Sequence, residues 1–208
     1  MEQNQRFILG SASPRRLELL RQIGVAPDAV LTADIDETPR KNEQARTLCL
    51  RLALEKNTAI RKKYPKESNN FHILTADTVV ACGRRLLGKP ENEDEAAAFL
   101  KMLSGRRHQV WGGIALSHPD GKIAKRVCKS IVSFGMLTPK DIDFYIESHE
   151  WQGKAGGYGI QGLAARHVKS ISGSYTNIVG LSLFETAQLL KGAGCLPFLN
   201  NQKSKLHD

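Results

Sequence analysis

The chain has 208 residues, of which 41% are hydrophobic and 25% are charged, a composition typical of an ordinary globular protein. Its 30 Lys and Arg outnumber its 21 Asp and Glu, and the resulting net charge of +9 favours anionic partners: nucleotides, nucleic acid or acidic membrane surfaces. No apolar run approaches the roughly 20 residues that span a bilayer, the start lacks a secretory pattern, and the four scattered cysteines lack metal-site spacing. We therefore expect a cytoplasmic protein with no membrane partner.

The first predicted elements are a short strand at 7–9 and a helix that begins just after Ser13. Ser13 is a good N-cap residue, and Pro14 suits the first helical position. Arg15 and Arg16 then fall at the positive end of the helix dipole, where acidic side chains are favoured. A bound anion would compensate for this placement, whereas two exposed surface arginines are the simpler alternative.

The middle of the chain alternates between helix and strand. The predicted segments are a helix at about 43–63, a strand at 71–81 with a short return at 86–87, a helix over 91–104, and a hairpin of strands 108–118 and 122–134. Pro119-Asp120-Gly121-Lys122 supplies the hairpin turn.

The last third predicts a helix from Thr138, a Gly-rich loop at 151–162, one or two strands within 167–180, a final helix after Ser182 and a polar tail at 199–208. Strands and helices alternate without a linker or an internal repeat. We therefore expect a single domain over residues 1–208, of the α/β class, with a central mixed sheet flanked by helices.

Two later helix starts serve as internal controls for the arginines. Thr138 is followed three residues later by Asp141, and Ser182 by Glu185, so both helices are predicted to have a capping box. The first helix has Arg16 at the corresponding position. This contrast favours an anion-binding site at the start of the first helix.

Asp77 interrupts an otherwise apolar strand, and an ionised carboxylate within a sheet is costly unless it is paired, hydrogen-bonded or bound to a metal. Asp77 could cap the end of the strand. Alternatively, it could face a cleft and hold a divalent cation or activate a water molecule. Glu37 belongs to a second acidic group in a loop, and Lys56 and Lys89 are unremarkable taken singly.

Several common site patterns are absent or misplaced. The run Gly157–Gly162 matches G-x-G-x-x-G, but neither a strand before it nor a helix after it is predicted. We therefore do not expect a dinucleotide-binding site there. The segment LGKP is not a Walker loop, the histidines lack zinc spacing, and no serine lies in a G-x-S-x-G turn.

Six motifs, SASPRR, ADTVV, LGKP, LSGRRHQV, KAGGYGIQG and GSYTNIVGL, occur in the order found in the Maf nucleoside triphosphate pyrophosphatases. The chain resembles this family from about residue 7 to 190. The resemblance implies an elongated Maf/ITPase-like fold with a twisted mixed sheet and a substrate cleft, often in a homodimer. It also implies hydrolysis between the α and β phosphates, with Mg²⁺ or Mn²⁺.

The resemblance assigns roles by position. It implies phosphate binding by Ser11, Arg15 and Arg16, basic cleft residues Lys56 and Lys89, an acidic loop residue Glu37, and a proton acceptor Asp77 close to the metal, with Glu37 and Asp77 as metal ligands.

The pair Asp77-Thr78 resembles the dTTP/UTP branch of the family, whereas the 7-methyl-GTP branch has Asp-Gln. Arg15, Thr78 and Gln161 match the positions linked to this specificity.

Gly112 and Ser182 depart from the family pattern, and we expect Gly112 to leave its strand looser. The alternatives are 7-methyl-GTP as substrate, or a basic nucleic-acid-binding or regulatory protein; aromatic content of only 6% disfavours nucleic acid. The cellular role could be nucleotide house-cleaning or control of division.

Overall fold

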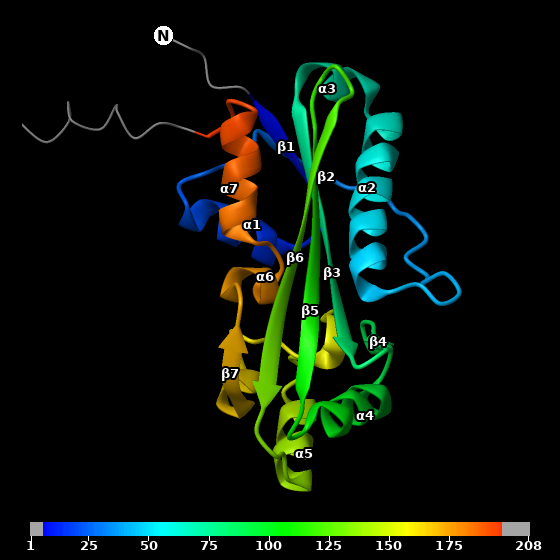
Figure 1. The fold of residues 1–208 in the computed structure, drawn as a ribbon, viewed down its shortest axis with the longest axis vertical. Helices are drawn as coiled ribbons and strands as arrows, with labels where there is room; N and C mark the ends of the chain where they lie inside the picture. Colours follow the sequence, from blue (N-terminus) through cyan, green and yellow to red (C-terminus); the bar gives the residue numbers. More distant parts are fainter. Residues whose placement is uncertain (1–5, 197–208) are drawn as a thin grey trace, which may run out of the picture.

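A mixed sheet of seven strands runs through the molecule in the computed structural model, which describes residues 6–196 (Figure 1). The strands are β1 (Phe7–Gly10), β2 (Ala29–Leu31), β3 (His72–Cys82), β4 (Arg85–Leu87), β5 (Arg107–Ser117), β6 (Ile123–Phe134) and β7 (Val168–Ser172). Their order is β2-β1-β3-β5-β6-β7, with β4 paired to β3. Strand β1 is parallel to β2 and β3, and the other pairings are antiparallel. The predicted α/β class with a mixed sheet is confirmed.

Helices cover both faces of this sheet. They are α1 (Pro14–Gln22), α2 (Ala45–Lys63), α3 (Pro65–Asn70), α4 (Glu93–Leu103), α5 (Pro139–Glu147), α6 (Tyr175–Val179) and α7 (Leu183–Gly192), with 3-10 turns η1 (Ala155–Gly157) and η2 (Leu163–His167). Figure 1 shows α2 on one side of the sheet and α1 and α7 on the other. None of the helices in residues 6–196 is both long and apolar enough to cross a bilayer.

Alternation along β3 divides its side chains between two hydrophobic cores. Val79 and Ala81 pack with Leu52 of α2, whereas Leu74 packs with Leu20 of α1 on the opposite face. Successive side chains in a strand point to opposite faces of the sheet, so this division also applies to Asp77 and Thr78. A third core lies under α4 and α5 at the far end of the molecule.

Most elements predicted from the sequence are present, and the predicted hairpin is formed by β5 and β6. Strand β2 and helix α3 were not predicted. The segment 167–180 holds a single strand, β7, and its second half forms α6. Ser174 caps α6 by accepting a hydrogen bond from the Asn177 N–H at 3.2 Å, and Gly180 ends the helix with a positive φ of 144°. The predicted polar tail at 199–208 lies outside the described residues.

The capping boxes differ between the two control helices. At α5, the Thr138 hydroxyl and the Asp141 carboxylate form the predicted reciprocal bonds. At α7 the prediction is wrong: Ser182 occupies the N-cap position but its side chain makes no capping bond. Instead, the Leu183 N–H donates to the Thr176 hydroxyl at 3.0 Å, because α6 ends directly beside this helix.

The expectation that Gly112 loosens its strand is also wrong. Gly112 and Gly113 lie inside β5, where both faces of the strand are tightly packed. A Cβ added at Gly112 would lie 2.1 Å from Oδ1 of Asn177, and one at Gly113 would lie 2.2 Å from the carbonyl oxygen of Cys49. The two glycines allow α6 and α2 to approach the sheet closely.

The edge of β3 that faces β1 is open along part of its length. Strand β1 pairs with β3 as far as Thr75, and β4 begins its pairing at Val80. Between these points, among the described residues, no strand pairs with that edge of residues 76–79, while β5 covers the other edge throughout. The opening contains Asp77 and Thr78.

Candidate active site

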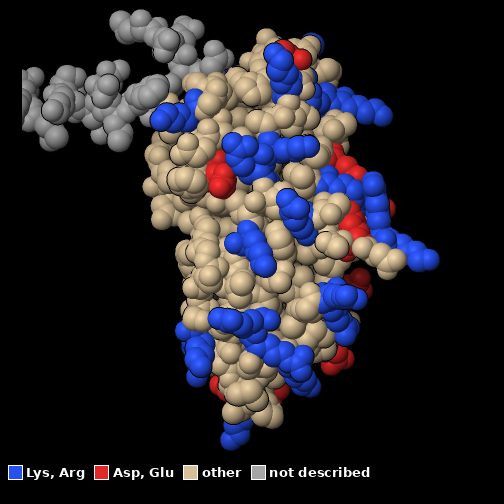
Figure 2. Space-filling model, in the orientation of Figure 1, with Lys and Arg blue, Asp and Glu red and all other residues tan. Residues whose placement is uncertain are grey.

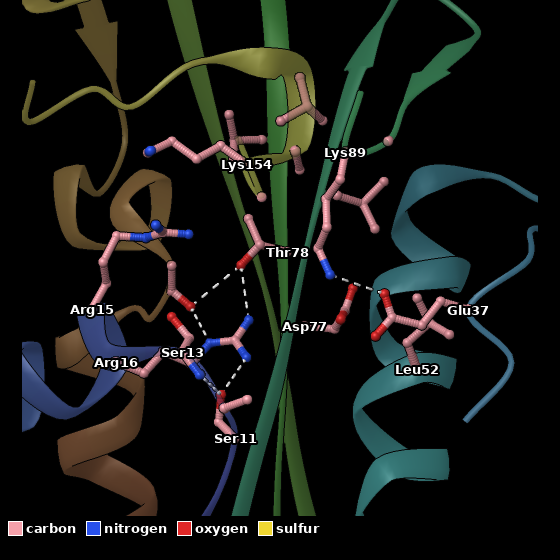
Figure 3. Close-up of a pocket in the computed structure, with 18 of the residues that line it drawn as sticks. Ser11, Ser13, Arg15, Arg16, Glu37, Leu52, Asp77, Thr78, Lys89 and Lys154 are labelled. Carbon is pink, nitrogen blue, oxygen red and sulfur yellow. Dashed lines mark hydrogen bonds and ion pairs between the residues drawn. The ribbon is translucent and has the colours of Figure 1, made fainter. Parts of the chain in front are cut away.

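A cavity of about 910 Å³ lies at this opening in the sheet. Its walls come from the start of α1, the loop before α2, α2 itself, β3, the segment after β4, the Gly-rich loop and the end of α6 (Figure 3). All nine site residues predicted from the sequence line it: Ser11, Arg15, Arg16, Glu37, Lys56, Asp77, Thr78, Lys89 and Gln161. Residues from six separate segments of the chain are therefore brought together.

Asp77 lies in the middle of β3 and not at its end, so the strand-cap interpretation is wrong. Its side chain is on the α2 face and the residue is only 7% exposed. The Lys56 ammonium lies 2.5 Å from Oδ1 of Asp77 and 2.7 Å from Oε1 of Glu37. Lys89 approaches the other Glu37 oxygen at 3.4 Å (Figure 3). Two carboxylates and two ammonium groups thus form one cluster.

The two carboxyl groups of this cluster differ in their protonation behaviour. Burial raises the pKa of Asp77 above its ordinary value, and this effect outweighs the opposing attraction of Lys56 and Arg16. Burial also acts to raise the pKa of Glu37, but hydrogen bonds and charge from Lys56 and Lys89 prevail and the pKa is lowered. Asp77 therefore has the stronger affinity for a proton, as a general base requires.

The loop that carries Glu37 is anchored by Arg51, a residue that the sequence did not single out. Arg51 of α2 donates to the Glu43 carboxylate at 2.8 Å, to Glu55 at 2.8 Å and to the carbonyl oxygen of Thr38 at 3.1 Å. The side chains of Arg51 and Glu43 are only 12% and 6% exposed. This network fixes the backbone immediately after Glu37.

Arg16 lies on the opposite face of β3, next to Thr78. Its guanidinium donates to the Gly180 carbonyl oxygen at 2.9 Å, to the Ser11 hydroxyl at 3.0 Å and to the Thr78 hydroxyl at 3.3 Å. The residue is only 9% exposed, and burial lowers its pKa, although an arginine stays charged in proteins. All three acceptors are neutral, so these hydrogen bonds fix the Arg16 guanidinium in the cavity wall without neutralising its positive charge.

Arg15 is more accessible than Arg16. It is half-buried, and its side chain extends into the cavity in Figure 3. The start of α1 has no side-chain cap, since the Ser13 side chain accepts no capping bond, and the first turn contains no acidic residue. The start of α1 therefore differs from the start of α5, which has a capping box and an acid in its first turn, as predicted.

The Gly-rich loop supplies the remaining wall. Gln161 is exposed and lines the cavity. Lys154 also lines it and is not among the site residues predicted from the sequence. The available signal was a basic residue two positions before the paired glycines of the predicted Gly-rich loop.

Among residues 6–196, no group of three or more His, Cys, Asp or Glu side chains is arranged to hold a metal ion. Asp77 and Glu37 nevertheless approach one another closely enough to share the Lys56 ammonium. Mg²⁺ is commonly held by one or two carboxylates together with substrate phosphate oxygens. The two carboxylates fit a cation of that kind when a phosphorylated ligand completes its coordination.

A buried carboxylate at an open strand edge, surrounded by lysine and arginine, defines a candidate active site for an anionic ligand on an α/β fold. A sequence model of the family described as "Maf-like protein" matches residues 6–193. The chain belongs to the Maf family.

Known relatives align over most of the chain. A protein of Paramagnetospirillum magneticum named "dTTP/UTP pyrophosphatase" is 54% identical over 191 residues, covering 92% of this chain and 98% of the relative. One of Agrobacterium fabrum with the same name is 51% identical over 192 residues, covering 91% and 93%. Among solved structures, a HAM1 protein from Coxiella burnetii aligns with 17% identity and a TM-score of 0.47, over 90% of this chain and 99% of that one.

Proposed function

We propose that this protein is a nucleoside triphosphate pyrophosphatase that hydrolyses dTTP and UTP to the nucleoside monophosphate and pyrophosphate. The observation that carries the proposal is Asp77, a buried carboxylate with a raised pKa at the open edge of β3, within a cavity lined by five Lys and Arg residues. The names of the relatives that align over nine-tenths of the chain support the choice of substrate.

The proposed reaction uses Asp77 as the proton acceptor. The carboxylate orients a water molecule, whose oxygen forms a bond to the α-phosphorus of the nucleotide. The bond between that phosphorus and the oxygen bridging to the β-phosphate breaks, pyrophosphate leaves, and the water proton passes to Asp77. The negative charge that develops on the phosphates is stabilised by the surrounding cations.

The remaining predicted residues divide between the two faces of β3. Lys56 and Lys89 lie on the Asp77 face and would bind the phosphate chain. Arg15, Thr78 and Gln161 would contact the nucleoside side. Arg16 donates a hydrogen bond to Ser11. We therefore propose that this pair stabilises the cavity wall and that Arg16 supplies positive charge near the phosphates.

Mg²⁺ or Mn²⁺ would be held by Asp77 and Glu37 together with substrate oxygens. When bound, such a cation neutralises phosphate charge and makes the α-phosphorus more electrophilic. Lys56 lies between the two carboxylates and would exchange one of these contacts for a phosphate oxygen.

A nucleotide panel tests the proposal. Pyrophosphate release from dTTP, UTP, CTP and 7-methyl-GTP is measured with Mg²⁺ and with Mn²⁺. We expect the highest kcat/KM with dTTP and UTP, and no release after chelation of the metal. A preference for 7-methyl-GTP would contradict the assignment to the pyrimidine branch, and the absence of turnover with every nucleotide would contradict the proposed activity.

A further inference from the structure

Two cationic side chains lie together on the Thr78 side of the cavity. Figure 3 shows Arg15 and Lys154 on the opposite side of the cavity from Glu37 and Lys89, with Thr78 between the two groups. Arg15 and Lys154 are close enough for the charge of Arg15 to contribute to lowering the pKa of Lys154, after the larger effect of burial. Neighbouring like charges disfavour the charged forms, and a ligand rich in hydrogen-bond acceptors that contacts both side chains would offset this repulsion.

The Gly-rich loop is shaped around the Lys154 side chain. A Cβ added at Gly159 would lie 2.8 Å from Cε of Lys154, so the aliphatic chain of the lysine lies against the bare glycine backbone. The ammonium donates to the carbonyl oxygen of Glu150, which fixes its position at the cavity wall. The Glu150 carboxylate accepts from the Leu163 N–H at 2.8 Å, and its charge partly opposes the lowering of the Lys154 pKa by burial.

Neither cation forms an ion pair with a neighbour within the described part of the chain, although the Glu150 charge acts on Lys154 from farther away. The described residues provide no ion pair to Arg15 or Lys154, in contrast to Lys56 and Lys89, which both pair with Glu37. An ammonium group has three donors, and the Glu150 contact uses one of them. Lysine and arginine donate but cannot accept, so the ligand groups that face them must be acceptors.

The Thr78 hydroxyl already makes hydrogen bonds within the protein, so it is poorly placed to recognise a base by itself. It accepts from Arg16 at 3.3 Å and donates to the Gly180 carbonyl oxygen at 3.3 Å. Asp77 and Thr78 point to opposite faces of β3, and both line the cavity together with Arg15 and Lys154. A nucleotide whose phosphates lie beside Asp77 can therefore place its base beside Thr78, Arg15 and Lys154.

We propose that Lys154, together with Arg15, recognises the keto edge of uracil or thymine and thereby discriminates against cytosine. Uracil and thymine present a carbonyl oxygen at position 4, which both side chains can contact as donors. Cytosine presents an amino group there, which would leave donors facing a donor. This inference rests on the proposed function and assigns the base preference of the same site to a residue outside the predicted set.

Steady-state kinetics with UTP and CTP test the assignment. We expect the wild type to prefer UTP, and Lys154→Met to reduce the ratio of kcat/KM for UTP over CTP by about ten-fold, as expected for loss of a charged hydrogen bond. Lys154→Arg retains the donors and should preserve most of the preference. The matched control is Lys169→Met, at an exposed lysine on β7. A partly unfolded preparation lowers both rates equally and leaves the ratio unchanged.

The inference is overturned if Lys154→Met lowers both values of kcat/KM equally, or if it weakens inhibition by inorganic tripolyphosphate as much as inhibition by UMP, because Lys154 would then bind phosphate. A wild type without preference for UTP over CTP would overturn it as well. Calorimetric measurement of the affinities for UMP and CMP tests base recognition in the absence of turnover. Selective loss of UMP binding in Lys154→Met would support the inference even if the proposed hydrolysis failed.

Discussion

At the scale of single residues, the site depends on two neighbours in β3 that point in opposite directions. Asp77 faces α2 and the lysines, and Thr78 faces Arg16 and the end of α6. The opening between β1 and β4 exposes this pair to the cavity without ending the strand. One strand edge can therefore hold both the reacting phosphate and the nucleoside.

Replacing Asp77 with Asn tests its role as the base. Asparagine has nearly the same shape but cannot accept the proton from water, so we expect kcat to fall by about 10²–10⁴-fold. Lys56 keeps its ion pair with Glu37 in this variant, so thermal unfolding should still show a folded protein. Pyrophosphate release close to the wild-type rate would contradict the assignment.

The pH dependence of kcat tests the pairing with Lys56. Burial raises the pKa of Asp77, and Lys56 partly opposes this rise. Activity that needs the ionised carboxylate increases as the pH rises through this pKa. Removing the ammonium in Lys56→Met should raise the pKa further and move the acidic limb of the profile to higher pH. An unchanged limb, or a shift to lower pH, would show that another group controls it.

At the scale of elements, the loop before α2 is held by charged groups in addition to the apolar contact of Ile35 with the core between α2 and β3. Its anchor is the Glu43–Arg51 pair, and the hydrogen bond from Arg51 lowers the pKa of Glu43 to about 2 from its ordinary 4.5. A lowered carboxyl pKa contributes stability that is present above the ordinary value and is lost as the pH falls toward the folded value.

Glu43→Gln tests this anchor. The substitution should lower the free energy of unfolding by about 1–2 kcal/mol at neutral pH, and the difference should shrink as the pH falls from about 5 toward 2. Urea unfolding at a series of pH values measures both effects, with Asp143→Asn as the control at an exposed α5 carboxylate. A difference that is independent of pH would show that Glu43 stabilises the loop by shape alone.

The close approach of α2 to β5 makes a separate prediction. Gly113→Ala places a methyl group 2.2 Å from the Cys49 carbonyl oxygen, and backbone atoms cannot move aside as a side chain can. We expect a loss of about 1–3 kcal/mol in the free energy of unfolding. The control is Gly192→Ala, where nothing lies within 4 Å. Equal stability of both variants in urea would contradict this packing.

The sequence predicted the long elements because their periodicity and end signals are local. The pattern of β3, the turn of the β5–β6 hairpin and the capping box of α5 are all readable from neighbouring residues. The cap of α7 could not be predicted, since its acceptor is Thr176 in another helix. Tertiary contacts likewise decide that Gly112 is a close-packing position.

The site residues were found from charge placed where local structure disfavours it, and from the family motifs. The arginines at the start of α1 and the acid within β3 both line the cavity. The sequence could not show that Arg16 is saturated by neutral acceptors, because Ser11, Thr78 and Gly180 meet only in the fold. Arg51 was missed for the same reason.

At the scale of the whole molecule, the excess of positive charge is distributed and not concentrated. Figure 2 shows Lys and Arg along the length of one face. The cavity is where cations meet the buried Asp77 carboxylate at an interruption of the sheet. The homodimer implied by the family resemblance stays a prediction, which analytical ultracentrifugation can test.

The most direct test of the central claim is hydrolysis of UTP in ¹⁸O-labelled water, followed by mass spectrometry of both products. The oriented water is proposed to attack the α-phosphorus beside Asp77. We therefore predict one ¹⁸O atom in UMP and none in pyrophosphate. Label in the pyrophosphate would place the attack at the β-phosphorus and contradict the account, as would release of UDP and inorganic phosphate.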